Sequence, residues 1–271
     1  TLNFNVGFEP DSFDPQASNV LETSIHLTQI YDYLYREDAD GNFVPSLAES
    51  YAVTPDNLTY TFTLRDGITF ADGTPITAED VVFSWTRALD PANAFEYAYQ
   101  LYYIQGGMEF NMGEATADAL ALKAIDEKTV EVTLTAPAPY FVSLTGFTTY
   151  GIVSKAFVEA QEKYGADINS TYGDAIETTL ASGPFKPVEW SKGQYVKYAK
   201  NENYWDKDAV KLDELYIYCV SESSTEIQMY DTDMLDITYM TMSVADQTRL
   251  GREGKLKEWG NLMTRYMMVN N

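Results

Sequence analysis

Carboxylates are the most numerous side chains in this sequence that could do chemistry. The chain of 271 residues holds 41 aspartates and glutamates against 18 lysines and arginines and one histidine. Two carboxyl groups at a suitable separation can serve as the acid and the base or nucleophile of a glycoside hydrolase. With so many acids some pairs form by chance, and no motif marks two of them out. A carbohydrate hydrolase using paired carboxylates therefore stays an alternative, without named residues.

The motifs of nucleophilic, metal-dependent and phosphate-binding sites are absent from the sequence. It contains no G-x-S-x-G, H-E-x-x-H, Walker loop or G-x-G-x-x-G. His26 stands alone beside an apolar helical face, whereas a zinc site needs several ligands. The stretch REDADGN resembles a calcium loop, but its register would place Arg36 at the first ligand position and Leu47 at the twelfth. We expect a turn between two strands there, no metal, no cofactor and no enzymatic activity.

Composition narrows the classes of partner. A net charge of −23 repels phosphate backbones and anionic lipid, so nucleic acid and membrane surfaces are not expected partners. No apolar run approaches membrane-spanning length. The single cysteine, Cys219, can form no internal disulfide, and its setting in LYIYCV predicts a buried strand. The chain opens on a strand-like run, TLNFNV, without a signal peptide, which suggests a processed or trimmed start.

The middle of the chain carries strong signals of local structure. Residues 58–64 alternate apolar side chains with threonines, which predicts a half-buried strand, and two Asp-Gly turns follow. Thr77 and Asp80 form a pattern like a capping box before an apolar helical stripe, and Asp90 and Pro91 end that helix. This strand, turn and capped helix hold no catalytic group. We interpret them as scaffold.

Strand and helix patterns alternate along the rest of the chain. Residues 128–134, 194–200 and 212–220 read as strands, and the stretches LTQIYDYLY, KAFVEAQEKYG and SSTEIQMYD read as helices. They lack the regular βαβ order of a nucleotide-binding domain. The fold class predicted is therefore mixed α/β (α+β).

Six stretches, in order, resemble one protein family. They are EPDSFDP, PSLAESY, TYTFTLRDGITFADGTPITAEDVVFSWTRALDP, KAIDEKTVEVTLTAPAPYF, SGPFKPVEW and NENYWD. Together they are similar to the extracellular solute-binding proteins of peptide ABC transporters, the oligopeptide- and dipeptide-binding family. The resemblance implies a periplasmic-binding-protein-like fold of the peptide-binding type. It also implies capture of an extended oligopeptide between two lobes and delivery to the membrane permease of the transporter.

The resemblance also implies a domain plan. Residues 32–153 would form a smaller inserted domain, and residues 1–31 plus 154–271 would form most of a first mixed-sheet domain. We expect the second lobe and the returning C-terminal segment to be missing, because the sequence ends at RYMMVNN, where family members cross over. A further departure is Thr232-Asp233, where the family usually has a glycine. That departure should change a turn and not the function.

Candidate site residues follow from the same resemblance. Asn19, Val20 and Leu21 match the segment that pairs with the peptide, although the family often has an acid where Asn19 stands. Tyr97 matches a tyrosine that covers the ligand. Three residues near the end match hinge or crossover positions: Tyr266, Asn270 and Asn271.

The expected surroundings are extracytoplasmic, with the natural protein a cell-surface lipoprotein or free in a periplasm. A chain lacking its second lobe would bind peptide weakly and self-associate through its exposed lobe interface. Receptors of the same fold for an oligosaccharide, a nickel chelate or haem remain alternatives.

Overall fold

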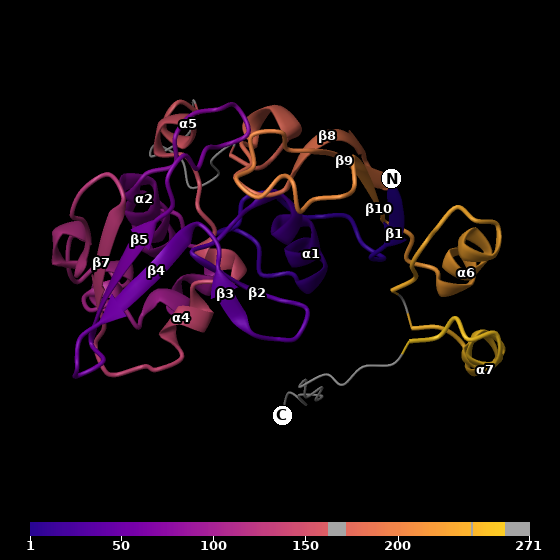
Figure 1. Cartoon of the computed structure of the whole chain (residues 1–271), viewed down its shortest axis with the longest axis horizontal. Coiled ribbons are helices and arrows are strands. Elements are labelled where there is room, and N and C mark those ends of the chain that lie inside the picture. The colour runs from indigo at the N-terminus through magenta and orange to yellow at the C-terminus, as the bar shows by residue number, and fades with distance from the viewer. Residues whose placement is uncertain (162–171, 240, 258–271) are drawn as a thin grey trace.

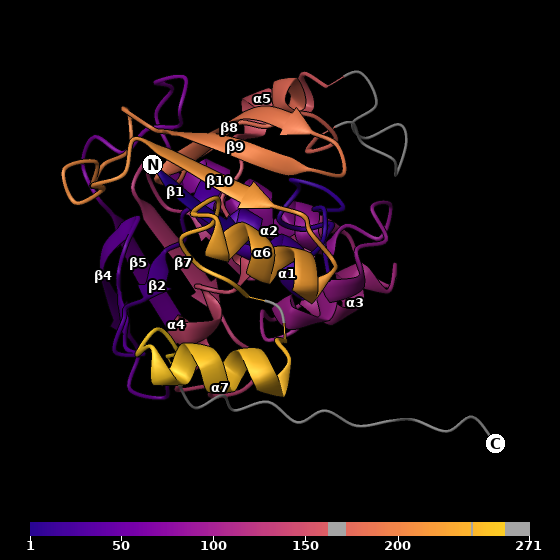
Figure 2. The same cartoon turned by 90° about the vertical axis from the view of Figure 1, so that its right-hand side faces the viewer.

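Two four-stranded sheets and the helices around them make up the molecule (Figures 1 and 2). The computed structural model describes residues 1–161, 172–239 and 241–257. One sheet has the strand order β1-β10-β9-β8 and the other the order β4-β5-β7-β6, and a separate hairpin pairs β2 with β3. The strands are β1 (Leu2–Asn5), β2 (Tyr35–Glu37), β3 (Phe43–Pro45), β4 (Ala48–Val53), β5 (Thr59–Leu64), β6 (Leu122–Ala124), β7 (Thr129–Thr133), β8 (Phe185–Ser191), β9 (Tyr195–Lys200) and β10 (Glu214–Tyr218). The predicted mixed fold class is confirmed.

Strand directions in the first sheet explain why it is mixed. β1 lies parallel to β10, whereas β8, β9 and β10 are joined as antiparallel neighbours. The second sheet is antiparallel throughout. The turn between β2 and β3 is held by Asp38, whose carboxylate accepts the main-chain N–H groups of Asp40 and Asn42, each at 2.9 Å. The turn predicted for REDADGN is therefore confirmed.

Short helices connect and cover the sheets. The α-helices are α1 (Leu21–Ile30), α2 (Ala78–Leu89), α3 (Gly107–Asn111), α4 (Phe141–Leu144), α5 (Lys155–Glu159), α6 (Ser223–Asp231) and α7 (Val244–Arg252). Four 3₁₀ turns join them in the described ranges: η1 (Glu96–Leu101), η2 (Ala117–Ala119), η3 (Thr148–Tyr150) and η4 (Ile176–Thr178). In Figure 1, α6 and α7 project from the side of the molecule where β1 and β10 lie.

The strand and capped helix predicted in the middle of the chain are both present. Alternate residues of β5, among them Tyr60 and Phe62, are buried, as a half-buried strand requires. At the start of α2, the main-chain N–H and the hydroxyl of Thr77 each donate to the Asp80 carboxylate at 2.9 Å. The helix ends at Leu89, before Asp90 and Pro91. The local sequence pattern therefore predicted this strand and this helix correctly.

The helix predicted for LTQIYDYLY is wrong in its extent. α1 begins earlier, at Leu21, and ends at Ile30. The Ile30 carbonyl accepts hydrogen bonds from the N–H groups of Ser182 and Gly183, at 3.0 and 2.9 Å. The Asp32 carboxylate accepts a hydrogen bond of 2.8 Å from the Tyr33 main-chain N–H, and local bonds of this kind compete with helix formation. For KAFVEAQEKYG, α5 covers only Lys155–Glu159, and the end of the stretch lies outside the described residues.

Buried apolar side chains form two cores. One surrounds the β4-β5-β7-β6 sheet and α2, and its members run from Leu34 to Ile152 with the addition of Leu180. The other lies between the β1-β10-β9-β8 sheet and α1, and its members come from residues 6–33 and 153–217. The domain boundaries at residues 31/32 and 153/154 stay a prediction, since separate cores do not by themselves define domains.

Three chain segments meet where the two cores adjoin. The Asp32 N–H donates to the Ser182 hydroxyl at 3.1 Å, and that hydroxyl donates to the Ile152 carbonyl at 3.2 Å. The Asp32 carboxylate also accepts the Ser46 hydroxyl at 2.6 Å and the Trp205 indole N–H at 2.8 Å. Burial raises the pKa of Asp32, and these donors oppose that rise. Direct or shared hydrogen bonds therefore connect Asp32 at this junction to four residues that are distant in sequence: Ser46, Ile152, Ser182 and Trp205.

His26 and Cys219 are residue types that can be reactive, but the surroundings of both disfavour reactivity. His26 is fully buried, and its Nδ1 shares a hydrogen bond of 2.6 Å with the Tyr198 hydroxyl. Burial lowers the pKa of His26 to about 3. Cys219 is half-buried and lies one residue past β10, so the prediction that it lies within a buried strand is wrong. Burial raises the pKa of its thiol to about 12, which leaves it a weak nucleophile.

The prediction that Thr232-Asp233 changes a turn stays a prediction, but the structure shows the backbone of this turn. Asp233 follows α6 with a φ of 59°, the left-handed region that glycine adopts without strain. Around it, the Met234 N–H reaches back to the Met229 carbonyl at 2.8 Å, as in a glycine-ended helix. An aspartate therefore occupies a backbone position suited to glycine.

Replacing this aspartate should stabilise the fold. We expect Asp233→Gly to raise the free energy of unfolding by about 1 kcal/mol, because it removes the cost of a side chain at positive φ. Asp233→Ala, which keeps a Cβ at the same φ, is the matched control and should give no such gain. Urea denaturation of the three proteins measures the difference. Equal stability of the glycine and alanine variants would show that the turn holds no strain.

Candidate ligand-binding site

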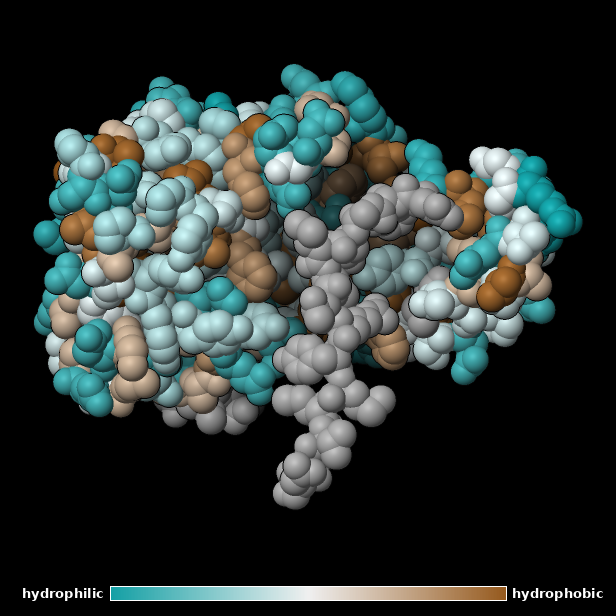
Figure 3. Space-filling view, turned by 90° about the horizontal axis from the view of Figure 1, so that it is seen from below, coloured by the Kyte–Doolittle hydropathy of each residue, from teal (hydrophilic) through white to brown (hydrophobic). Residues whose placement is uncertain are grey.

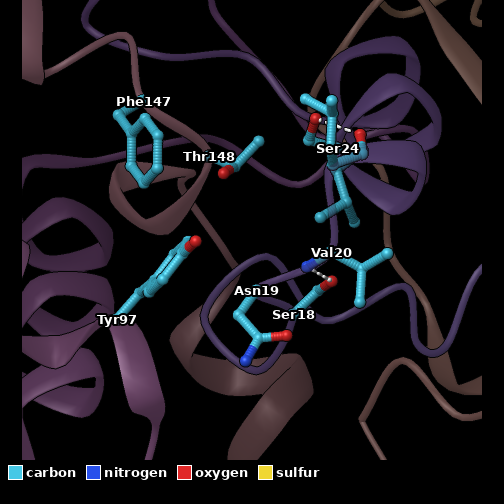
Figure 4. Close-up of a pocket in the computed structure, with 9 residues that line it drawn as sticks. Ser18, Asn19, Val20, Ser24, Tyr97, Phe147 and Thr148 are labelled. Carbon is cyan, nitrogen blue, oxygen red and sulfur yellow. Dashed lines mark hydrogen bonds between the residues drawn. The ribbon is translucent and has the colours of Figure 1, made fainter. Parts of the chain in front are cut away.

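A small hollow brings the predicted ligand-binding residues together (Figure 4). Its volume is about 130 Å³, close to that of a cavity known to hold benzene in another protein. In Figure 4, Tyr97 and Phe147 lie on one side of the hollow, and Val20 and Ser24 lie on the other. The lining residues are Ser18, Asn19, Val20, Leu21, Ser24, Leu27, Tyr97, Phe147 and Thr148. Asn19, Val20, Leu21 and Tyr97 thus share one surface, although 76 residues separate Leu21 from Tyr97.

One wall is formed by residues 19–21, where the chain passes from extended backbone at Val20 into the first residue of α1, and we call it the 19–21 edge. Val20 has φ −95° and ψ 129°, which is strand-like backbone. Its N–H donates to the Ser18 hydroxyl at 3.3 Å. Within the described ranges, neither the main-chain N–H nor the carbonyl of Asn19 has a hydrogen-bond partner, and the Asn19 residue is exposed. The edge therefore offers main-chain groups that an extended ligand could pair with.

A buried ion pair fixes the loop that leads into the edge. Asp14 and Arg87 form a two-pronged pair, in which the Arg87 Nη1 lies 2.9 Å from one carboxylate oxygen and Nη2 bonds the other. Their side chains are 3% and 0% exposed. Arg87 lies on α2, so the pair joins the N-terminal loop to the helix specified by the capping box.

Gln16 extends this attachment. Its side-chain carbonyl accepts a bond of 2.5 Å from Arg87, and its amide donates to the Gly151 carbonyl at 2.8 Å. Gly151 follows η3, which carries Thr148 of the hollow. The loop, α2 and the far wall are therefore held as one unit, three residues before the edge.

The opposite wall is aromatic. Tyr97, the second residue of η1, is half-buried, and its ring centroid lies 5.9 Å from that of Phe147 and 5.7 Å from that of Tyr99. Centroid distances of this size are typical of favourable aromatic pairs. The Asn19 amide donates to the carboxylate of Glu96, the residue before Tyr97. This bond links the two walls directly.

Sequence reasoning missed five of the nine lining residues: Ser18, Ser24, Leu27, Phe147 and Thr148. Phe147 and Thr148 lie in a stretch without a recognisable pattern, and Ser18 and Ser24 are ordinary residues around a helix start. Only the three-dimensional structure shows that these residues line the same hollow as Tyr97. The proposed hinge residues Tyr266, Asn270 and Asn271 lie outside the described residues.

The surface around the hollow is apolar. Leu21, Tyr99 and Phe147 are 51%, 50% and 37% exposed. A second, almost wholly apolar groove of about 390 Å³ is lined by Leu2, Phe4, Ile25, Gln29, Phe185, Leu212, Leu215, Ile237 and Tyr239. Figure 3 shows hydrophobic residues along the hollowed surface between the main body and the α6–α7 part.

The described residues offer neither a cluster of metal ligands nor a membrane-spanning helix. In residues 1–161, 172–239 and 241–257, no group of three or more His, Cys, Asp or Glu side chains could hold a metal ion. Among the same residues, no helix combines the length and apolar character that crossing a membrane requires.

Comparison with known proteins assigns the family. The model of bacterial extracellular solute-binding proteins, family 5 (middle region), matches residues 42–271. The chain belongs to this family. The family resemblance expected from the six sequence stretches is confirmed.

Two similar curated relatives are peptide-binding proteins of Bacillus subtilis. The oligopeptide-binding protein OppA is 36% identical over 236 residues, which cover 87% of this chain and 42% of the relative. The dipeptide-binding protein DppE is 35% identical over 239 residues, 88% of this chain and 42% of the relative. The chain therefore spans less than half the length of these relatives, both of which are named as peptide-binding proteins.

Solved structures give the same fold. Listeria monocytogenes OppA bound to peptide superposes with a TM-score of 0.84 at 32% identity, covering 92% of this chain and 48% of the other. The predicted binding-protein fold is confirmed over about half of such a structure.

Breaking the Asp14–Arg87 pair should damage the fold around the edge. We expect Arg87→Met to lower the free energy of unfolding by about 3–5 kcal/mol, because it leaves the Asp14 carboxylate buried without its cation. Chemical denaturation at neutral pH measures the loss.

A double variant separates the charge from the packing. In Asp14→Leu with Arg87→Met, no unpaired charge stays buried, so most of the stability should return. If the double variant is as unstable as Arg87→Met, packing and not the unpaired carboxylate accounts for the loss.

Proposed function

We propose that the full-length protein is the substrate-binding component of an ABC importer for oligopeptides. It captures a peptide in extended form between two lobes and delivers it to the membrane permease. The observation that carries this proposal is the hollow in which the 19–21 edge, with the main-chain groups of Asn19 unpaired among the described residues, faces Tyr97. Relatives named for oligopeptide and dipeptide binding support the same substrate class.

The chemistry of the edge suits peptides of many sequences. Main-chain N–H and C=O groups are the same in every peptide, so pairing with them ignores side-chain identity. The hollow adds room for a side chain of moderate size against aromatic and aliphatic groups. Any preference among peptides would then come from the side chains that surround the main-chain contact, such as those lining the hollow.

The ligand would be enclosed only when the second lobe is present. The 19–21 edge and Tyr97 contact one side of an extended chain, and its other side would face water. We propose that residues 1–31 with 154–271, and the insert 32–153, together form one lobe. Tyr266, Asn270 and Asn271 would belong to the crossover toward the other.

The natural setting proposed is outside the cytoplasm, as a lipoprotein or a free periplasmic protein. No catalytic role is proposed, because the hollow holds no titratable group among its lining residues except the Tyr97 phenol. The exposed apolar surface around Leu21, Tyr99 and Phe147 supports self-association of this chain when it stands alone.

This chain by itself should bind peptides poorly. We expect the full-length protein to bind tri- to pentapeptides with micromolar affinity and this chain to bind more weakly than about 1 mM. The entropy cost of immobilising the ligand is the same when only half of the contacts form. Each loss of roughly 1.4 kcal/mol of binding free energy weakens the affinity tenfold. Calorimetric titration of both proteins with a mixed peptide library makes the comparison.

Two results would contradict the proposal. Micromolar binding by this chain would show that one lobe is a complete site. Mass spectrometry of ligands retained by natively purified full-length protein tests the substrate class, since an oligosaccharide, a nickel chelate or haem in place of peptides would favour the alternative receptors.

Tyr97 should matter more than other exposed tyrosines. In the full-length protein, Tyr97→Ala should weaken peptide binding about tenfold or more, because it removes one wall of the hollow. Tyr140→Ala is the control: Tyr140 is 53% exposed and does not line the hollow. If both variants bind like the wild type, Tyr97 is a packing residue and not a ligand contact.

A further inference from the structure

Glu96 lies at the rim of the hollow without a cationic partner. It begins η1, precedes the wall residue Tyr97 and accepts a hydrogen bond from the Asn19 amide. Its side chain is exposed, and among the described residues it forms no ion pair with a lysine or arginine. A carboxylate in this position is available to a ligand.

The segments that build the hollow carry no free positive charge. Residues 14–30, 96–101 and 141–150 contain no lysine or arginine, and their only histidine is the neutral His26. Their acids are Asp14, Glu22 and Glu96, and Asp14 is already paired with Arg87. The unpaired charge that these segments present is therefore negative, and Glu96 is the carboxylate bonded to the 19–21 edge.

We propose that Glu96 makes the site select peptides that carry a protonated amine beside Asn19. This inference rests on the proposed function and adds the charge of the preferred ligand to it. An extended peptide paired with the edge would place its own side chains or its N-terminal ammonium within reach of the same rim. Closure of the site would remove water from the pair and strengthen the attraction.

The bond between Glu96 and Asn19 allows charge and positioning to be separated. Glu96→Gln removes the negative charge, while its side-chain carbonyl can still accept the Asn19 amide hydrogen. Glu96→Ala removes both the charge and the bond. Glu49→Gln, on β4, is the matched loss of one exposed carboxylate away from the hollow.

The experiment compares two tripeptides that differ at one side chain, lysine or the uncharged norleucine, in full-length protein. We expect wild type and Glu49→Gln to prefer the lysine peptide about three- to tenfold. Glu96→Gln should lose that preference while its affinity for the N-acetylated norleucine peptide, which carries no protonated amine, stays the same. N-acetylated versions of both peptides show whether the side chain or the N-terminal ammonium supplies the cation. The preference should also decrease as salt is raised.

The outcomes distinguish this inference from the proposed function. If no peptide binds to the wild type, the proposed function is wrong. If peptides bind and Glu96→Gln changes neither the ratio of lysine to norleucine affinity nor the ratio of free to N-acetylated affinity, only the charge selection is wrong. If Glu96→Ala alone weakens both peptides equally, Glu96 acts by positioning Asn19 and the inference is overturned.

Discussion

The buried pair of Asp14 and Arg87 is the interaction on which the candidate site depends. The two side chains are 3% and 0% exposed and come from an N-terminal loop and from α2, 73 residues apart. Removing two charges from water is costly, and their attraction compensates only when the geometry is good and other bonds complete the network. Gln16 supplies such bonds, to Arg87 and to Gly151. The loop can therefore take few other positions, and the 19–21 edge follows it directly.

The same arrangement explains why the edge can keep unpaired main-chain groups. Exposed N–H and C=O groups can pair with water, but a segment held by water alone is free to move. Here it is anchored by the ion pair before it and by the first turn of α1 after it. Facing it, Tyr97 and Phe147 limit how far it can move. The restraint comes from buried contacts outside the edge, so the exposed main-chain groups of Asn19 can stay without a partner among the described residues.

Local patterns were sufficient for part of the fold and not for the rest. β5, the capping box of α2 and the turn at Asp38 were all predicted, because neighbouring residues determine them. The end of α1 was not, because it depends on Ser182 and Gly183, about 150 residues later. For the site, the resemblance supplied the 19–21 edge and Tyr97, whereas Phe147, Thr148 and Glu96 are brought there by the tertiary fold alone. No period or motif in the sequence marks those three.

The position of β1 affects the order in which the chain can fold as it is made. Leu2 pairs with Leu215, so the first strand cannot take its place until more than 200 residues have been synthesised. By contrast, β4, β5, β6 and β7 all come from residues 48–133 and can pair long before that. Contacts between distant residues form slowly because a long loop must close first. During synthesis the second sheet can therefore form early, while β1 and its apolar residues stay exposed to solvent and to chaperones until the first sheet closes.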